Sequence, residues 1–164
     1  MSQTHMAIYR NVWRWHFYAG IVVAPFMLLL AITGAIYLFN DEINDALYPE
    51  LRFAATSGQS LPLSAIATGA LGSFPGGAVT RIDTPTAHGR TFQVYVTPSA
   101  GDPVRVFVDP ASGRAQGTYF YPHTLIGIAD LLHGSLLMGD FGDAIVEIVA
   151  CWGLILVATG TYLW

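Results

Sequence analysis

Histidines are the side chains in this 164-residue chain best suited to chemistry. There are five of them, at His5, His16, His88, His123 and His133. A neutral imidazole is a common metal ligand, and its charge changes near physiological pH. The sequence has no Ser–His–Asp arrangement and no paired carboxylates that would indicate hydrolysis. Ligation of a metal or a cofactor is therefore the chemistry that the residues favour.

The cysteine content narrows the kind of metal site. Cys151 is the only cysteine. A single thiol excludes an internal disulfide framework and any zinc or iron–sulfur site built from several cysteines.

Two apolar segments must position these histidines. The first, residues 17–39, has no charged residue and as a helix would reach roughly 35 Å, against a hydrocarbon core of roughly 30 Å. The second, residues 144–164, carries one charge, Glu147. Backbone in lipid must satisfy its own hydrogen bonds, so both segments are predicted to be transmembrane helices. His16 then lies at the start of the first span, and His133 lies shortly before the second.

Composition agrees with a membrane protein. The chain is 53% hydrophobic and 11% charged, whereas a soluble domain is about 25% charged. Its net charge of −4 and its lack of a basic patch exclude a nucleic-acid partner. The lipid bilayer is the partner that the composition indicates.

Charge around the first span predicts the topology. Arg10 and Arg14 precede it, whereas four acidic residues and one arginine follow within residues 40–52. The positive-inside rule places residues 1–16 in the cytoplasm and residues 40–143 outside, with both termini cytoplasmic. A cleaved signal peptide is a weaker alternative, because the apolar run is longer than a signal-peptide core.

The region between the spans is predicted to hold a small α/β module over about residues 53–118. A helix is expected at residues 61–71, because Ser60 can cap it and Pro62 fits its first turn. Three antiparallel strands are expected at residues 78–83, 91–97 and 104–108. An amphipathic helix over about residues 123–138 would then lie at the membrane interface, and Gly139–Asp143 would interrupt it before the second span.

Three stretches of the chain share a recognisable pattern. The first is Trp13–Gly20, followed by Thr33-Gly34. The second runs from Leu132-His133-Gly134 through Trp152-Gly153 to Thr159–Trp164, and the third is the turn Val108–Gly113. In their order along the chain, these stretches resemble the PepSY-associated transmembrane family. The resemblance implies a membrane α-helical protein with two transmembrane helices and a small extracytoplasmic α+β module of the PepSY type.

The resemblance also implies a function and a location. The family includes iron-regulated proteins of the bacterial inner membrane, and some are di-haem reductases that pass electrons to ferric siderophores. Members typically have further spans and a second PepSY-like region, so this chain resembles their N-terminal half. The implied cofactor is a b-type haem, because the sequence has no Cys-x-x-Cys-His motif. A ferric-siderophore acceptor and a ferric reductase activity are what this reading implies.

His16 and His133 are the histidines that the resemblance marks as axial ligands to haem iron. They are expected on opposite sides of the bilayer, so each would serve a separate haem. The second ligands would come from a second copy, another polypeptide or, less favourably, His123. Gly20 and Gly34 share a helical face with His16 and leave room there for a flat ligand or a closely packed helix.

Other readings stay open at this point. An interfacial histidine often only bonds a neighbouring group, and the chain would then be a membrane-anchored PepSY module that binds a protein or peptide without redox activity. A truncated half of a larger four-span protein is a further possibility. Glu147 is either a functional carboxylate or a side chain that reaches the interface.

Overall fold

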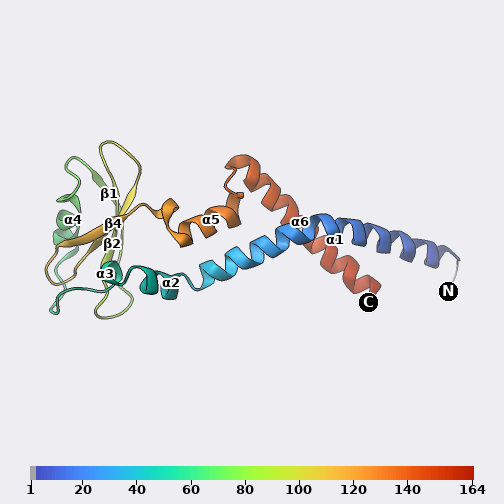
Figure 1. Ribbon diagram of the computed structural model, residues 1–164, viewed down its shortest axis with the longest axis horizontal. Helices are drawn as coiled ribbons and strands as arrows, with labels where there is room; N and C mark the ends of the chain where they lie inside the picture. Colours follow the sequence, from blue (N-terminus) through green and yellow to red (C-terminus); the bar gives the residue numbers. More distant parts are fainter. Residues whose placement is uncertain (1–2) are drawn as a thin grey trace. The chain divides into compact units, whose positions relative to one another are not determined.

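The computed structural model describes residues 3–164, which form two compact units. One unit contains the chain up to Leu38 together with Ile128–Trp164, and the other contains Phe39–Gly127. The elements can be followed along the chain by colour in Figure 1. We describe each unit by itself.

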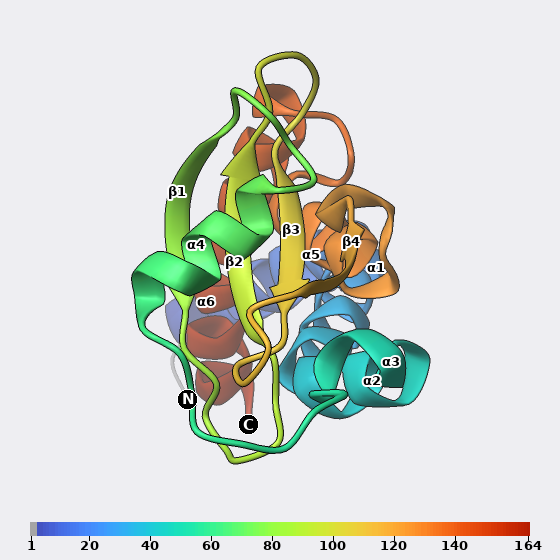
Figure 2. The same cartoon turned by 90° about the vertical axis from the view of Figure 1, so that its left-hand side faces the viewer.

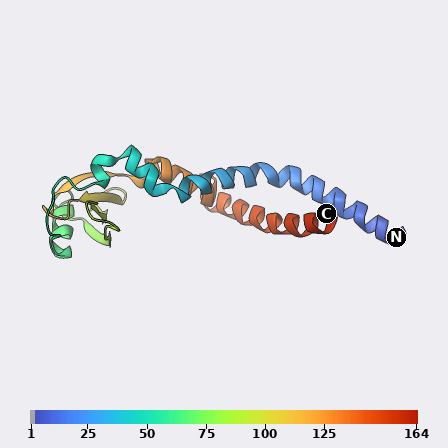
Figure 3. The ribbon, with the colours of Figure 1, turned by 90° about the horizontal axis from the view of Figure 1, so that it is seen from below.

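The first unit is a pair of long apolar helices. Helix α1 spans Gln3–Leu38 and helix α6 spans Asp140–Leu163, and both are long and apolar enough to cross a membrane. The two helices lie side by side and antiparallel, with the start of α1 near the end of α6 (Figure 3). Large apolar side chains point outward along both, as expected of a surface that meets lipid. The prediction of two membrane helices is confirmed.

The link between helix α5 (Leu125–Ser135) and α6 is tight. Gly139 has a φ of 60°, and a side chain at Gly142 would collide with the carbonyl oxygen of Ser135. The sequence predicted that residues 139–143 would interrupt the helix. Instead only Gly139 lies outside α6, because Asp140 and Asp143 form its first turn, where carboxylates are stabilised by the helix dipole.

The second unit is an antiparallel sheet with the strand order β1-β2-β3-β4. Its strands are Ala78–Asp83, Phe92–Thr97, Val104–Val108 and Ala115–Tyr119. Helix α4 (Leu63–Leu71) covers one face, as Figure 2 shows. Ile66 and Ala70 of α4 are buried against alternate residues of the central strands, such as Val94 and Val106. This α+β module confirms the expected fold class.

Strand β4 was not predicted. The sequence analysis expected three strands, whereas β4 pairs with β3 as a fourth. Its residues are small or polar, so they carry little strand signal of their own. Gly117 leaves room there for Leu51, whose Cδ2 would lie 2.5 Å from an added Cβ and would have to shift.

Three short helices complete this unit. Helix α2 spans Asn40–Leu47, α3 spans Pro49–Arg52 and the 3₁₀ helix η1 spans Tyr121–His123. Phe39 separates α2 from the end of α1, and Pro49 begins α3, because proline fits the first turn of a helix.

A buried aspartate organises the turn after β3. The Asp109 side chain accepts hydrogen bonds from the backbone N–H of Thr56 (2.8 Å), Ala111 (2.9 Å) and Ser112 (2.9 Å). It also accepts one from the Thr56 hydroxyl at 2.6 Å. Burial opposes ionisation, but these hydrogen bonds outweigh it and hold the pKa of Asp109 well below its usual range.

Candidate functional site

His16 is bonded to the end of the opposite membrane helix. Its Nδ1 lies 2.8 Å from Oγ1 of Thr159 on α6. The ring also rests against Gly160, where a methyl group would lie 3.3 Å from the imidazole Cε1. We call Thr159 and Gly160 the His16 seat. Within residues 3–164, the structure records no hydrogen bond to Nε2 of this ring.

His133 is held in a matching way at the other end of α1. Its Nδ1 lies 3.1 Å from Oγ1 of Thr33 and 3.0 Å from the carbonyl oxygen of Leu30. A methyl group at Gly34 would lie 3.1 Å from the imidazole Cε1. We call Leu30, Thr33 and Gly34 the His133 seat. A carbonyl only accepts hydrogen bonds, so Nδ1 is the donor, and in the neutral ring Nε2 carries the lone pair.

The two seats stand near opposite ends of the helix pair. Thr33 follows His16 by 17 residues of α1, which corresponds to roughly 26 Å along the helix axis. The hydrocarbon core of a bilayer is roughly 30 Å thick. Each imidazole therefore offers one open nitrogen at a different membrane depth, and one planar cofactor in this helix pair cannot reach both.

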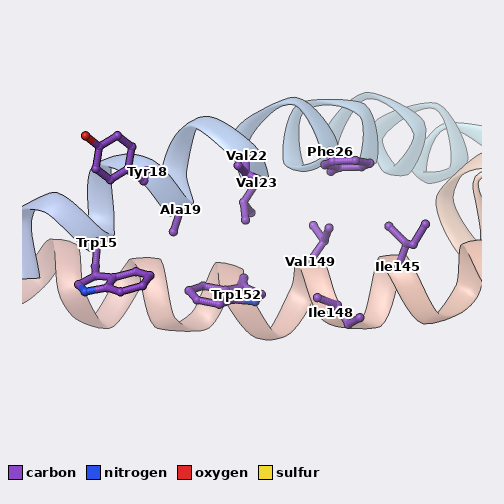
Figure 4. A pocket seen from close by; sticks show the side chains of 10 residues that line it. All are labelled: Trp15, Tyr18, Ala19, Val22, Val23, Phe26, Ile145, Ile148, Val149 and Trp152. Carbon is purple, nitrogen blue, oxygen red and sulfur yellow. The ribbon is translucent and has the colours of Figure 1, made fainter.

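An apolar groove runs along the same helix pair. Its volume is about 450 Å³, and residues of α1 and α6 line it from both sides (Figure 4). The lining residues are Trp15, Tyr18, Ala19, Val22, Val23, Phe26, Ile145, Ile148, Val149 and Trp152. Such a surface suits an apolar or flat aromatic group better than a polar one.

The α/β unit has a polar cavity of about 390 Å³. Arg52 lines it and is buried, with 7% of its side chain exposed, and it pairs with Asp45 at 2.9 Å and with Asp41. Arg90 also lines the cavity and shares Asp45. Burial opposes ionisation of Asp45, but hydrogen bonds from Arg90 and Arg52 lower its pKa. Burial likewise opposes the charge of Arg52, yet Asp45 and Asp41 raise its pKa.

Comparison with known proteins identifies the family. A family model described as the PepSY-associated TM region matches residues 13–164. The chain belongs to this PepSY-associated family. The match takes in α1 from Trp13 onward, α6 and the α/β unit. It therefore includes His16, His133 and both seats. No curated protein matches the chain.

The seats of this PepSY-associated region differ from what helical periodicity predicted. Gly34 was expected beside His16, but it contacts His133 instead. Gly20 has no atom within 4 Å of the position that a side chain would take. Thr33 and Thr159 belong to the sequence pattern of the family, but their hydrogen bonds to the imidazoles were not predicted. The recurrence of Thr-Gly near the end of each apolar segment was the available signal.

The remaining candidate residues of the PepSY-associated chain lie elsewhere. His123 belongs to η1 in the α/β unit, where its ring meets Phe120 edge-on at 4.7 Å. His88 is exposed in the loop between β1 and β2, and Glu147 is on an exposed side of α6. Across residues 3–164, no three His, Cys, Asp or Glu side chains gather to hold a metal ion.

Proposed function

We propose that this membrane protein carries electrons through b-type haem, with His16 and His133 each giving one axial ligand to a separate haem. The observation that carries the proposal is the hydrogen bonding of the two imidazole rings. Each has Nδ1 engaged by a hydrogen-bond partner and Nε2 open, which is the usual arrangement of a histidine that ligates a metal. Axial ligation of haem needs only one such nitrogen from each residue.

The residues of this chain fit that cofactor in other respects. A bound haem would supply one-electron chemistry, while the helices would supply its ligands and an apolar setting that tunes its potential. The groove between α1 and α6 adds apolar surface to the membrane unit, although neither His16 nor His133 lines it. The second axial ligands would come from a second copy of the chain or from another polypeptide.

Orientation gives the proposed transfer a direction. By the positive-inside rule, Arg10 and Arg14 support a cytoplasmic side for the N-terminal end of α1, and with it His16. Family resemblance supports a bacterial-type inner membrane. His133 would then lie near the outer face. Electrons would pass outward to an extracytoplasmic acceptor, for which family resemblance favours a ferric siderophore. The activity would be that of a membrane ferric reductase.

The test is an optical spectrum of the detergent-purified protein, first oxidised and then reduced with dithionite. We expect a Soret band and sharp reduced α and β bands. His16→Ala and His133→Ala should each remove about half of the reduced signal, because each site acts alone. His88→Ala is the control, since His88 is exposed in a loop. Bands that survive both substitutions, or no bands after expression with ample haem, would refute the assignment.

An alternative function is that of a membrane-anchored PepSY module that binds a protein or peptide. Strand β1 supports it, because it is an edge strand with half of its residues exposed, and an extended peptide can add to such an edge. A photo-crosslinking residue in place of Thr80 would test this in cells. Capture of one specific protein, together with absent haem bands, would favour the alternative over electron transfer.

A further inference from the structure

We infer that Thr159 and Thr33 are positioning residues that keep each imidazole in the Nδ1–H form, with the Nε2 lone pair open. Thr159 does this alone for His16, whereas the Leu30 carbonyl shares the task with Thr33 for His133. The tautomer assignment stands on hydrogen-bond geometry alone. Its consequence for ligand binding rests on the proposed haem function.

The proton inventory at Thr159 assigns the direction of the hydrogen bond. A threonine hydroxyl has one proton to donate. The Thr159 hydroxyl lies 2.8 Å from the carbonyl oxygen of Ile155 and 3.2 Å from that of Leu156, so it donates within its own helix. Its remaining interaction with His16 must be as an acceptor. Nδ1 of His16 is therefore the donor, and Nε2 is left unprotonated in the neutral ring.

The same count of donors and acceptors at Thr33 shows that His133 has a second acceptor beside the threonine. The Thr33 hydroxyl donates to the carbonyl oxygens of Leu29 (2.9 Å) and Leu30 (3.2 Å), and so accepts from Nδ1 of His133. The Leu30 carbonyl accepts from that nitrogen as well. Loss of the Thr33 hydroxyl leaves one acceptor in place, but loss of the Thr159 hydroxyl leaves none among the described residues.

The two seats repeat one design in opposite directions. Each apolar segment follows a histidine and has Thr-Gly near its end, and the two helices are antiparallel. Each histidine therefore meets the Thr-Gly pair of the other segment. The recurrence of the same contact at both ends of the helix pair favours a shared role for Thr33 and Thr159 over two unrelated contacts.

The threonines should matter to a ligand on Nε2. A partner that accepts the other ring proton fixes the ring orientation and raises the basicity of the ligating nitrogen, and its loss typically costs 10–100-fold in metal affinity. We expect Thr159→Val to weaken haem retention at the His16 site by about that factor. Thr33→Val should have a smaller effect at the His133 site. The midpoint potential of the affected haem should become more positive, because its imidazole donates less electron density.

The first experiment reads the tautomers without haem. ¹⁵N-histidine spectra of the purified protein, assigned with His16→Ala and His133→Ala, should show Nδ1–H at both rings. Thr159→Val should release His16 to a mixture of tautomers, and Thr159→Ser should restore it. Thr161→Val is the matched control, because its hydroxyl lies two residues further along the same helix and donates only to the carbonyl of Val157. Circular dichroism checks that every variant keeps its helices.

The second experiment measures haem affinity and potential in the same variants. An Nε2–H ring at His16 in the native protein would overturn the inference, as would equal effects of Thr159→Val and Thr161→Val. If haem binds through His16 but Thr159→Val leaves both tautomer and potential unchanged, the inference fails and the proposed function survives. If the tautomers are as inferred but no haem binds, the proposed function fails and the structural role of the threonines stands.

Discussion

Removal of the Asp109 carboxylate should destabilise the α/β unit strongly. The residue is 1% exposed, and three backbone N–H groups and one hydroxyl donate to it. A hydrogen bond to a charged group contributes about 1.5–3 kcal/mol, and contributions within one cluster do not add fully. We therefore expect Asp109→Ala to cost about 3–5 kcal/mol, since the donors of Thr56, Ala111 and Ser112 lose their partner.

Hydrogen exchange of the full chain in detergent measures this cost. Amides of β2 and β3 report opening of the α/β unit, while those of α6 report the membrane unit and should not change. Asp102→Ala is the matched control, because Asp102 lies in an exposed turn. Equal protection of β2 and β3 in Asp109→Ala and in Asp102→Ala would refute the reasoning.

The pH dependence follows from the same carboxylate. Its pKa in the folded protein lies below the value of about 3.9 of an unfolded chain. The stability it contributes is therefore fully present above about pH 4 and is lost as the pH falls through the folded-state pKa. The difference in protection between native protein and Asp109→Ala should narrow on acidification below pH 4. A constant difference would contradict the assignment of the charge.

Four further substitutions, one of them a control, test other contacts. Gly160→Ala should displace His16 and weaken haem retention, whereas Gly20→Ala should leave the reduced spectrum unchanged, because no atom lies within 4 Å of the added carbon. Gly117→Ala should cost about 1–3 kcal/mol in protection of β4, because the new methyl group overpacks α3. Arg52→Gln should cost about 3 kcal/mol in the same assay, because it leaves Asp45 with half of its pairing in a largely buried site.

The main elements of the fold could be predicted from local patterns. Long uncharged runs indicated both membrane helices, and alternating apolar residues indicated β1, β2 and β3. Strand β4 was not predicted, because its residues are small or polar. Its position depends on pairing with β3 and on the room that Gly117 leaves for Leu51.

The sequence predicted the two histidines of the candidate site but not the residues that contact them. Residue type and position near a membrane span selected His16 and His133. Helical periodicity shows which residues share one helix face, but not which residue of another helix lies opposite. Gly34 was therefore assigned to the histidine of its own helix, although it contacts His133. The threonines were missed because their bonds to the imidazoles join residues more than 90 positions apart.

A purely structural role for His16 makes a different prediction from a ligand role. The bond from Nδ1 to Thr159 joins α1 to α6, and that alone would justify a histidine at this position. Asparagine places an N–H donor close to the position of Nδ1 but has no counterpart of Nε2. If His16 only joins the helices, His16→Asn should keep both helix protection and the reduced spectrum. If Nε2 binds iron, His16→Asn should keep protection of α6 and lose the same haem band as His16→Ala. Loss of α6 protection in both variants would instead make His16 a structural residue first, because even a retained donor would not replace the ring.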